Sequence, residues 1–307
     1  MKRRDFIRKS FGAGIATSAA LTFDPFSTLQ AAEDNVKLPY DMVAVKGGEP
    51  IEMFEKGIAQ LGGMKTFVKQ GQTVVVKPNI GWSVTPERAA NTNPDLVYAV
   101  IKHCFVAGAK KVYVFDHTCN EWTACYEKSG IEARAKEAGA AVMPGNEREY
   151  YKEVEIPKGK ALKKTDVHEL VLNSDVFINI PVLKHHGGAK MSLCMKNLMG
   201  IVWNRRSWHA GDLQQCIADM ATYKKPDLNI VDGYRVLKRK GPRGVSVEDV
   251  ATMKYQMIGT DMVALDTAAC KVFGIDPEIV KHIPLAQEHG VGSMDLDSMN
   301  IKRISIS

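Results

Sequence analysis

The sequence contains six cysteines, but no two of them stand in a C-x2-C arrangement. Iron–sulfur clusters of the ferredoxin type and rubredoxin-like metal sites are built on such closely spaced pairs. The sequence therefore excludes a ferredoxin-type iron–sulfur motif within this chain, and it leaves the identity of any other cofactor open. Internal repeats and low-complexity segments are absent as well, and 45% of the residues are hydrophobic, so global disorder is excluded.

Long hydrophobic runs are also missing. No window approaches the roughly 20 consecutive apolar residues that a helix needs to span a bilayer. The net charge is +6, but residues 1–32 hold five basic and two acidic residues, which leaves 36 basic and 33 acidic residues in the remainder. With so small an excess we predict a protein without a permanent membrane span and without a nucleic-acid partner.

The first residues resemble a twin-arginine export signal. Lys2-Arg3-Arg4-Asp5-Phe6 begins a charged segment, and the weakly hydrophobic run FGAGIATSAALTF follows it. The resemblance implies recognition by the twin-arginine translocation machinery, removal near residues 30–32, and a periplasmic or otherwise exported protein. It also implies transport in the folded state, often around a cofactor that is inserted in the cytoplasm.

The cysteines do not form an obvious disulfide framework. Cys104 and Cys216 lie on apolar stripes of helical spacing, which is typical of small core residues. Cys119 and Cys125 stand near the end of a predicted strand, where they are candidates either for a disulfide or for metal ligation.

From residue 40 onward strand-like and helix-like segments alternate, which is typical of a βαβ architecture. We predict an α/β fold with a mostly parallel sheet and helices on both faces. Residues 33–307 form one domain in this prediction, with a two-lobed arrangement as an alternative and residues 143–164 as a surface hairpin or the seam. The predicted strands are 42–46, 73–77, 111–115, 176–180, 228–231, 255–258 and 301–306. The predicted helices are 51–61, 94–107, 123–138, 191–202, 213–223, 262–273 and 277–289.

Polar side chains follow four of the predicted strands. These are Lys77-Pro78-Asn79, Asp116-His117, Lys184-His185-His186 and Asp232-Gly233. Open α/β sheets bind their ligands at the carboxyl ends of parallel strands. We therefore expect Lys77, Asn79, Asp116, Lys184 and Asp232 to meet at one edge of the sheet. At any single position, an aspartate that caps a helix or closes a turn is the competing interpretation.

Residues 176–211 contain no carboxylate but three lysines, two arginines and three histidines. Gly187 and Gly188, followed by Lys190, are predicted to open a helix whose amides hold an anion. Lys184 and Lys190 would add point charges to that site. The sequence thus predicts a pocket for a small anionic ligand, such as a carboxylate or a phosphate.

Three histidines of this segment are candidates for chemistry, because imidazole changes its charge near neutral pH and also binds metals. His185, His186 and His209 are the metal-ligand candidates. We select His186 and His209 as the catalytic candidates.

The chain resembles the domain-of-unknown-function 362 family. The matching segments include VVVKPNIGW, NTNPDLVYAVI, GAKKVYVFD, LNSDVFINIPVLKHHGGAKMSLCMKNLMG and GTDMVALDTAAC. The resemblance implies an α/β fold and two recurrent motifs, Lys77-Pro78-Asn79 and the segment that contains Lys196, Asn197 and Gly200. It thereby adds Lys196 and Asn197 to the predicted binding residues. The family has no settled activity.

A second, weaker resemblance is to the nickel-pincer lactate racemase group, based on SDVFINIPVLKHHGGAK and the later Trp208-His209. It implies Lys190 as the residue that tethers the cofactor, with His186 and His209 as the imidazoles.

Two functions of different classes follow from these observations. One is an exported enzyme, a redox enzyme or a racemase-like isomerase, that binds an anionic substrate or a phosphorylated or metal cofactor. The other is a non-catalytic solute- or metal-binding protein, or an accessory protein for an exported redox enzyme. The cationic segment would also suit a docking surface for an acidic partner protein.

Overall fold

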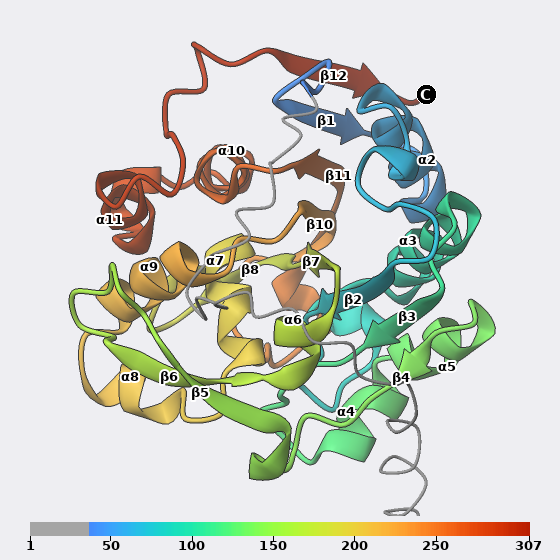
Figure 1. Cartoon of the computed structure of the whole chain (residues 1–307). Helices are drawn as coiled ribbons and strands as arrows, with labels where there is room; N and C mark the ends of the chain where they lie inside the picture. Colours follow the sequence, from blue (N-terminus) through green and yellow to red (C-terminus); the bar gives the residue numbers. More distant parts are fainter. Residues whose placement is uncertain (1–36) are drawn as a thin grey trace, which may run out of the picture. The chain divides into compact units, whose positions relative to one another are not determined.

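A ten-stranded sheet runs through residues 37–307, the part of the chain that this computed structural model describes (Figure 1). The neighbouring strands follow the order β12-β1-β11-β10-β7-β2-β3-β4, and β8 pairs with β10 and β9. Most of these pairs are parallel, and antiparallel pairing is confined to β11 with both its neighbours and to β8 with β9. The predicted mostly parallel sheet is confirmed. The proposed export signal at residues 1–32 lies outside the described residues.

The strands have the following bounds: β1 Met42–Lys46, β2 Thr73–Pro78, β3 Lys111–Val114, β4 Ala141–Val142, β5 Tyr151–Glu155, β6 Lys164–His168, β7 Val176–Ile180, β8 Val182–His186, β9 Lys190–Ser192, β10 Leu228–Leu237, β11 Val250–Gly259 and β12 Ile301–Ser305. The α-helices are α2 Pro50–Gln60, α3 Pro94–Ala107, α4 Trp122–Lys128, α5 Ile131–Glu137, α6 Glu169–Asn173, α7 Cys194–Asn197, α8 Arg206–Ala210, α9 Leu213–Tyr223, α10 Met262–Phe273 and α11 His282–Glu288.

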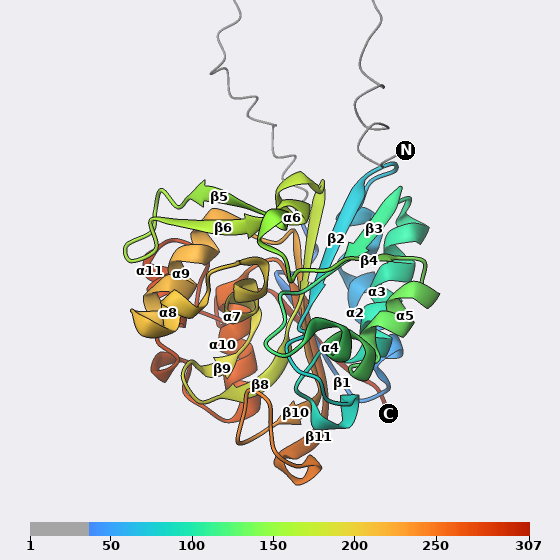
Figure 2. The ribbon, with the colours of Figure 1, turned by 90° about the horizontal axis from the view of Figure 1, so that it is seen from below.

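Helices cover both faces of the sheet, as predicted. One face carries α2, α3 and α5, and the other carries α7, α9, α10 and α11 (Figure 2). Strand β2 shows how the sequence produces this arrangement, because side chains alternate between the two faces of a strand. Val74 and Val76 enter the core beneath α3, whereas Val75 enters the core on the opposite side. A strand buried on both faces therefore reads as a continuous valine run.

Helix α3 has the boundaries that local signals predict. Asn93 caps its start by accepting a hydrogen bond from the Asp95 backbone N–H at 2.9 Å, and Pro94 is the first helical residue. Gly108 ends the helix with a φ of +105°, a left-handed conformation that glycine adopts without steric cost.

Three predicted helices are wrong. The segment 277–289 consists of the 3-10 helix Pro277–Ile279 and the shorter helix α11. The segment 123–138 divides into α4 and α5 at Gly130, whose φ is +71°. The segment 191–202 begins with strand β9, continues as the short helix α7 and ends in the 3-10 helix Leu198–Ile201. Strand β9 pairs antiparallel with β8 in the register His186↔Lys190, so Gly187 and Gly188 form a hairpin turn and do not open a helix.

The segment 143–164 contributes to a hairpin at the surface. Strands β5 and β6 pair antiparallel and form a separate two-stranded sheet. This pairing agrees with the hairpin alternative of our prediction, although the second strand, Lys164–His168, lies almost entirely beyond the predicted segment. Residues 37–307 cluster as one compact unit, and none of its helices has the length and hydrophobicity required to cross a membrane.

Candidate functional site

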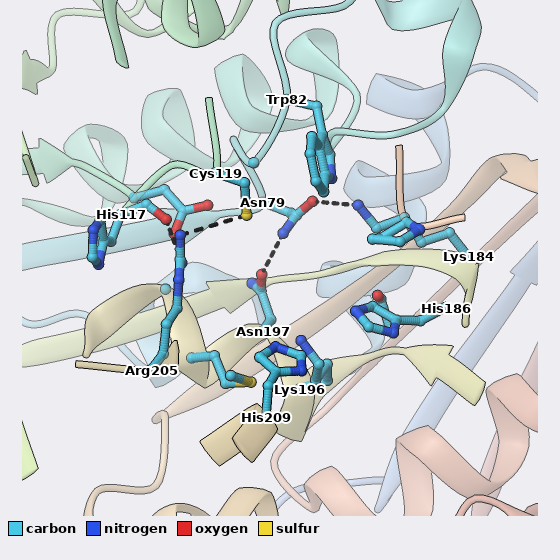
Figure 3. Close-up of a pocket in the computed structure, with 16 residues that line it drawn as sticks. Asn79, Trp82, His117, Cys119, Lys184, His186, Lys196, Asn197, Arg205 and His209 are labelled. Carbon is cyan, nitrogen blue, oxygen red and sulfur yellow. Dashed lines mark hydrogen bonds between the residues drawn. The ribbon is translucent and has the colours of Figure 1, made fainter. Parts of the chain in front are cut away.

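A cavity of about 270 Å³ lies beyond the carboxyl ends of β2 and β3 and beside β8, at the edge of the sheet where we expected the site (Figure 3). We call it the strand-end pocket. It is lined by Asn79, Gly81, Trp82, Asp116, His117, Cys119, Lys184, His186, Ser192, Lys196, Asn197, Met199, Gly200, Arg205, His209 and Pro242.

Three basic side chains reach this cavity from different elements. Lys184 comes from β8 and Lys196 from α7, and Arg205 is the residue directly before α8. In Figure 3, Lys184 and Arg205 lie on opposite sides of Asn79 and Asn197, with Lys196 below them. The strand-end pocket is therefore positive on several walls, which favours a negatively charged ligand.

The one carboxylate among the lining residues, Asp116, is already engaged. Its Oδ1 lies 2.9 Å from the Lys77 Nζ, and its Oδ2 accepts a hydrogen bond of 2.6 Å from the Ile80 backbone N–H. Lys77 and Asp116 are 0% and 2% exposed, so they form a buried ion pair beneath the cavity. Burial lowers the pKa of Lys77, and the Asp116 carboxylate opposes this effect.

Gly200 covers this ion pair. A Cβ atom at position 200 would lie 1.9 Å from the Asp116 Oδ1 and 2.6 Å from the Lys77 Nζ. The carbonyl oxygen of Gly200 also accepts a hydrogen bond of 2.9 Å from the His117 backbone N–H, which fixes the backbone in place. Position 200 therefore requires a residue without a side chain.

A chain of four asparagines supports the cavity. The Lys184 Nζ donates to the Asn79 Oδ1 at 2.8 Å, and the Asn79 Nδ2 donates to the Asn197 Oδ1 at 3.1 Å (Figure 3). The Asn197 Nδ2 then donates to the Asn179 Oδ1 at 2.8 Å, and the Asn179 Nδ2 donates to the Asn229 Oδ1 at 2.9 Å. Every carboxamide donates in the same direction, away from Lys184, so the amide dipoles align and strengthen one another.

Lys184 is 1% exposed and makes two hydrogen bonds, one to Asn79 and a short one to the Ala90 backbone oxygen. Burial is the main cause that lowers its pKa to about 7, and the nearby Lys196 contributes. The amine therefore changes its protonation state at neutral pH. Two of its tetrahedral positions hold acceptors, which leaves one position for a ligand in the strand-end pocket.

His186 is fixed in one tautomer. Its Nδ1 accepts hydrogen bonds from the backbone N–H groups of Gly188 and Ala189, at 3.1 and 3.0 Å. Burial and the charges of Lys196 and Lys184 lower its pKa to about 2, so the imidazole is neutral and carries its proton on Nε2. His186 is consequently a hydrogen-bond donor toward the cavity.

His209 is exposed, and its ring stacks parallel to that of His186 with the centroids 6.3 Å apart. Burial of part of the ring, together with the positive charges of Lys196 and Arg205, lowers its pKa. Neither histidine is therefore held as a cation in this positive environment.

Arg205 is attached to the loop that follows β3. Its Nη1 donates to the His117 backbone oxygen and its Nη2 to the Thr118 backbone oxygen, both at 2.5 Å. The Nη2 also lies 3.5 Å from the Sγ of Cys119, which is an exposed free thiol. The His117 ring stacks on Trp203 with centroids 5.1 Å apart and further orders this loop.

Helix α7, which carries Lys196 and Asn197, is anchored by Asp266. The Asp266 carboxylate is fully buried and accepts hydrogen bonds from the Cys194 and Met195 backbone N–H groups, at 2.7 and 3.2 Å. Burial raises the pKa of this carboxyl to about 7. Asp266 therefore positions α7 and does not line the cavity.

The structure brings seven of the predicted site residues together around the cavity and places Lys77 directly beneath them. The seven are Asn79, Asp116, Lys184, His186, Lys196, Asn197 and His209. In β8, Lys184 and His186 share a face because they are two residues apart. His185 points the other way, where its Nδ1 accepts a hydrogen bond from the Gly241 backbone N–H at 3.1 Å.

Gly187, Gly188, Lys190 and Asp232 do not line the cavity, which corrects our expectation for them. The two glycines belong to the β8–β9 turn, and Lys190 is exposed on β9 with a φ of +65°. Strand β10 continues past Asp232 to Leu237, so this aspartate is not at a strand end. It is buried and accepts a hydrogen bond of 2.7 Å from the Asn93 backbone N–H.

The predicted metal and cofactor assignments do not fit this geometry. Within residues 37–307, no three His, Cys, Asp or Glu side chains gather in a way that could hold a metal ion. Lys190 cannot tether a group in the cavity from its exposed place on β9, and His186 presents an N–H instead of a lone pair. The residues implied by the resemblance to nickel-pincer enzymes therefore do not form a site for that cofactor.

Sequence reasoning missed several residues of the pocket. Trp82, Arg205 and Pro242 reach the cavity from loops, Ser192 from the unpredicted strand β9, and Met199 from the 3-10 helix Leu198–Ile201. Pro242 comes from the β10–β11 loop, whose Gly241 carbonyl oxygen accepts a hydrogen bond of 3.3 Å from the Gly187 backbone N–H. Among them Arg205 had a usable signal, because it is a basic residue in the segment 176–211, which contains no carboxylate.

Among curated proteins, the chain is similar to the thylakoid-associated protein sll1697 of Synechocystis sp., with 26% identity over 239 residues that cover 75% of this chain and 72% of that protein. Two solved structures are also similar. They are the lactate racemase apoprotein of Thermoanaerobacterium thermosaccharolyticum, with a TM-score of 0.46 and 11% identity, and a Thermotoga maritima protein, with a TM-score of 0.43 and 13% identity. The matches cover 76% and 78% of this chain, but only 57% and 60% of those longer chains.

The family model described as domain of unknown function (DUF362) matches residues 74–271. This range starts in β2, ends in α10 and includes the lining residues of the strand-end pocket. The chain belongs to the DUF362 family.

Proposed function

We propose that this chain is an enzyme that binds a small carboxylate- or phosphate-bearing molecule in the strand-end pocket and catalyses proton transfer to or from that molecule. The observation that carries the proposal is the convergence of Lys184, Lys196 and Arg205 on one cavity whose single carboxylate is neutralised by Lys77. Such a cavity lowers the energy of a bound anion, because its cations have no other counter-ion there.

The proposed proton-transfer group is Lys184. Its ordered hydrogen bonds to Asn79 and Ala90 orient the amine, and its pKa of about 7 allows it to accept or release a proton at neutral pH. His186 supplies an Nε2–H that can stabilise negative charge on an oxygen of the substrate. This combination supports an isomerase-like reaction at a carbon next to a carbonyl or carboxylate group. It assigns His186 the role of a donor and replaces our prediction of acid–base catalysis by this residue.

The alternative is a non-catalytic anion-binding or accessory protein. The fixed tautomer of His186 favours it, since the Nδ1 lone pair of this imidazole is occupied by two backbone N–H groups and is not available as a base. We also propose that residues 1–32 direct export through the twin-arginine pathway, on the basis of their sequence. Fractionation of the native host would show the chain in the cytoplasm if this proposal is wrong.

Removal of the Lys184 charge should weaken anion binding. In Lys184→Gln the side chain keeps a donor for Asn79 but loses its charge, so we expect the dissociation constant for pyruvate or inorganic phosphate to rise roughly 10- to 100-fold. Calorimetric titration near pH 6, where Lys184 is protonated, measures this change. Lys190→Gln is the matched control, because Lys190 is exposed outside the cavity. An equal loss of affinity in both variants would contradict the proposed binding site.

Proton transfer should appear as hydrogen exchange between a bound substrate and the solvent. We expect the native protein to catalyse exchange of the C3 hydrogens of pyruvate in deuterated water near pH 8, followed by proton NMR. Lys184→Gln should lose roughly 100-fold or more of this rate, because a general base contributes that much. Saturating pyruvate binding without any exchange would favour the non-catalytic alternative.

A further inference from the structure

Lys196 differs from the other basic residues at the site because its charge has no partner. Within residues 37–307, its Nζ takes part in no hydrogen bond or ion pair, whereas Lys77, Lys184 and Arg205 all have acceptors at 3.0 Å or less. An ammonium group without an acceptor in a partly enclosed cavity is costly, but a neutral amine is much less so. The geometry therefore favours the nucleophilic form of Lys196.

The surroundings of Lys196 act in the same direction. Burial is the largest cause that lowers its pKa to about 8, and Arg205 and Lys77 contribute, while Asp116 and Cys119 oppose the shift. The titratable and charged groups near it are Lys77 on β2, Asp116 and Cys119 after β3, Lys184 and His186 on β8, Arg205 and His209 at α8, and the buried His282 on α11. Relative to an ordinary lysine, the neutral fraction at neutral pH rises roughly 300-fold.

We propose that Lys196 is a nucleophilic lysine that forms an imine with a small 2-oxo acid, an inference that rests on the proposed function of the same pocket. The amine lone pair attacks the carbonyl carbon and forms the C–N bond. The carbonyl oxygen takes up one proton as the nitrogen loses one, which gives a carbinolamine. A second proton, from the Lys184 ammonium group or from solvent, then lets the hydroxyl group leave as water while the nitrogen lone pair forms the C=N bond; this nitrogen keeps its remaining hydrogen or exchanges it with solvent. The protonated C=N nitrogen carries the positive charge, and no oxidant or reductant is required.

Lys196 suits this role better than Lys184 does. Lys184 is 1% exposed, and two of its positions are occupied by Asn79 and Ala90. Lys196 is half-buried and lines the cavity, and in Figure 3 it lies beside His209. A carbonyl group can therefore approach its nitrogen without breaking an existing hydrogen bond.

The same geometry selects the substrate class. Lys184 and Arg205 flank the space above Lys196, so a carboxylate next to the reacting carbonyl would remain beside a positive charge throughout the reaction (Figure 3). A cavity of about 270 Å³ is at the small end of ligand sites, which fits a short 2-oxo acid and not a large cofactor.

Reductive trapping tests the proposal on the whole chain. The protein is incubated with pyruvate, glyoxylate, oxaloacetate or 2-oxoglutarate and sodium cyanoborohydride, and the labelled residue is found by peptide mass mapping. We expect one label per chain, on Lys196, that forms on the order of tenfold faster than on any surface lysine. The rate should rise with pH through about 8, as the amine loses its proton. Acetaldehyde has no carboxylate, so it should label Lys196 no faster than it labels surface lysines. Lactate has no ketone or aldehyde carbonyl, so it should not label the protein but should compete with the 2-oxo acids for the pocket.

Lys196→Arg keeps the positive charge and should abolish the selective label, while Lys190→Arg should leave it unchanged. Selective labelling of Lys184, or labelling of surface lysines alone with all four acids, overturns the proposal even in the unmodified protein. Calorimetry separates the two levels of inference. If pyruvate and lactate bind but no label forms, the imine is wrong and the anion site stands; if neither binds and no label forms, both proposals are wrong.

Discussion

In Asp116→Asn, we expect the free energy of unfolding to fall by about 3–5 kcal/mol, because the substitution leaves the Lys77 ammonium buried without a counter-charge. The carboxylate serves two donors, Lys77 at 2.9 Å and the Ile80 backbone N–H at 2.6 Å. Asparagine has a single side-chain oxygen, so its NH2 group must face one of these donors. Urea unfolding measures the loss directly.

The double variant Lys77→Met, Asp116→Asn is the control, and it should recover a large part of the stability since no charge is then buried alone. The pH dependence gives a second check. Without the carboxylate, the already lowered pKa of Lys77 falls further, so Lys77 loses its proton in the folded state at a lower pH than in the parent protein. A neutral Lys77 no longer needs a counter-charge. The deficit of Asp116→Asn should therefore shrink as the pH rises. A deficit below about 1 kcal/mol at neutral pH would contradict the role of this ion pair.

In Gly200→Ala, we expect a destabilisation of about 1–3 kcal/mol or more and a loss of anion binding. The added methyl group would lie 1.9 Å from the Asp116 Oδ1 and 2.6 Å from the Lys77 Nζ, so the ion pair must move. Neither partner has free space, because both are buried. Since the Lys77 Nζ also donates to the Asn197 Oδ1 at 3.0 Å, the displacement extends to the lining of the cavity.

Gly187→Ala is the matched control for this substitution. A Cβ atom at Gly187 would meet only the Gly241 carbonyl oxygen, at 3.9 Å, and its φ lies outside the left-handed region. It should therefore change both stability and affinity little. Thermal unfolding and calorimetric titration of both variants with phosphate provide the comparison, and a Gly200→Ala protein that matches the parent in both measurements would show that the ion pair tolerates displacement.

The predictable parts of the fold are those that local residues determine. The valine run of β2 and the signals Asn93, Pro94 and Gly108 around α3 define their elements without help from the rest of the chain. The segment that follows β8 could not be read in this way. Its apolar methionines fit a helix stripe, but the pairing of β9 with β8 depends on contacts between strands, which a helical pattern does not reveal.

The same distinction explains which site residues were found. Asn79, Asp116 and Lys184 could be predicted because parallel strands place the residues at and beyond their ends along one edge. Lys190 was selected because two glycines stand shortly before it, although the β8–β9 turn directs it into solvent. Among the described residues that line the cavity, Lys196 is the lysine whose amine makes no hydrogen bond or ion pair. Trp82 and Pro242 lie in loops whose positions depend on distant contacts, so a sequence pattern gives no indication of them.

The row of carboxamides beneath Lys184 has a fixed polarity, because Asn79, Asn197 and Asn179 each donate a hydrogen bond to the next asparagine and Asn229 accepts the last one. Substitution of any one of them by aspartate would replace a hydrogen-bond donor by an acceptor, and the neighbouring carboxamide would then have to flip. The four positions should consequently be inherited or exchanged as a set: relatives that keep the buried lysine should keep all four amides, and those that lose one should have rebuilt the others.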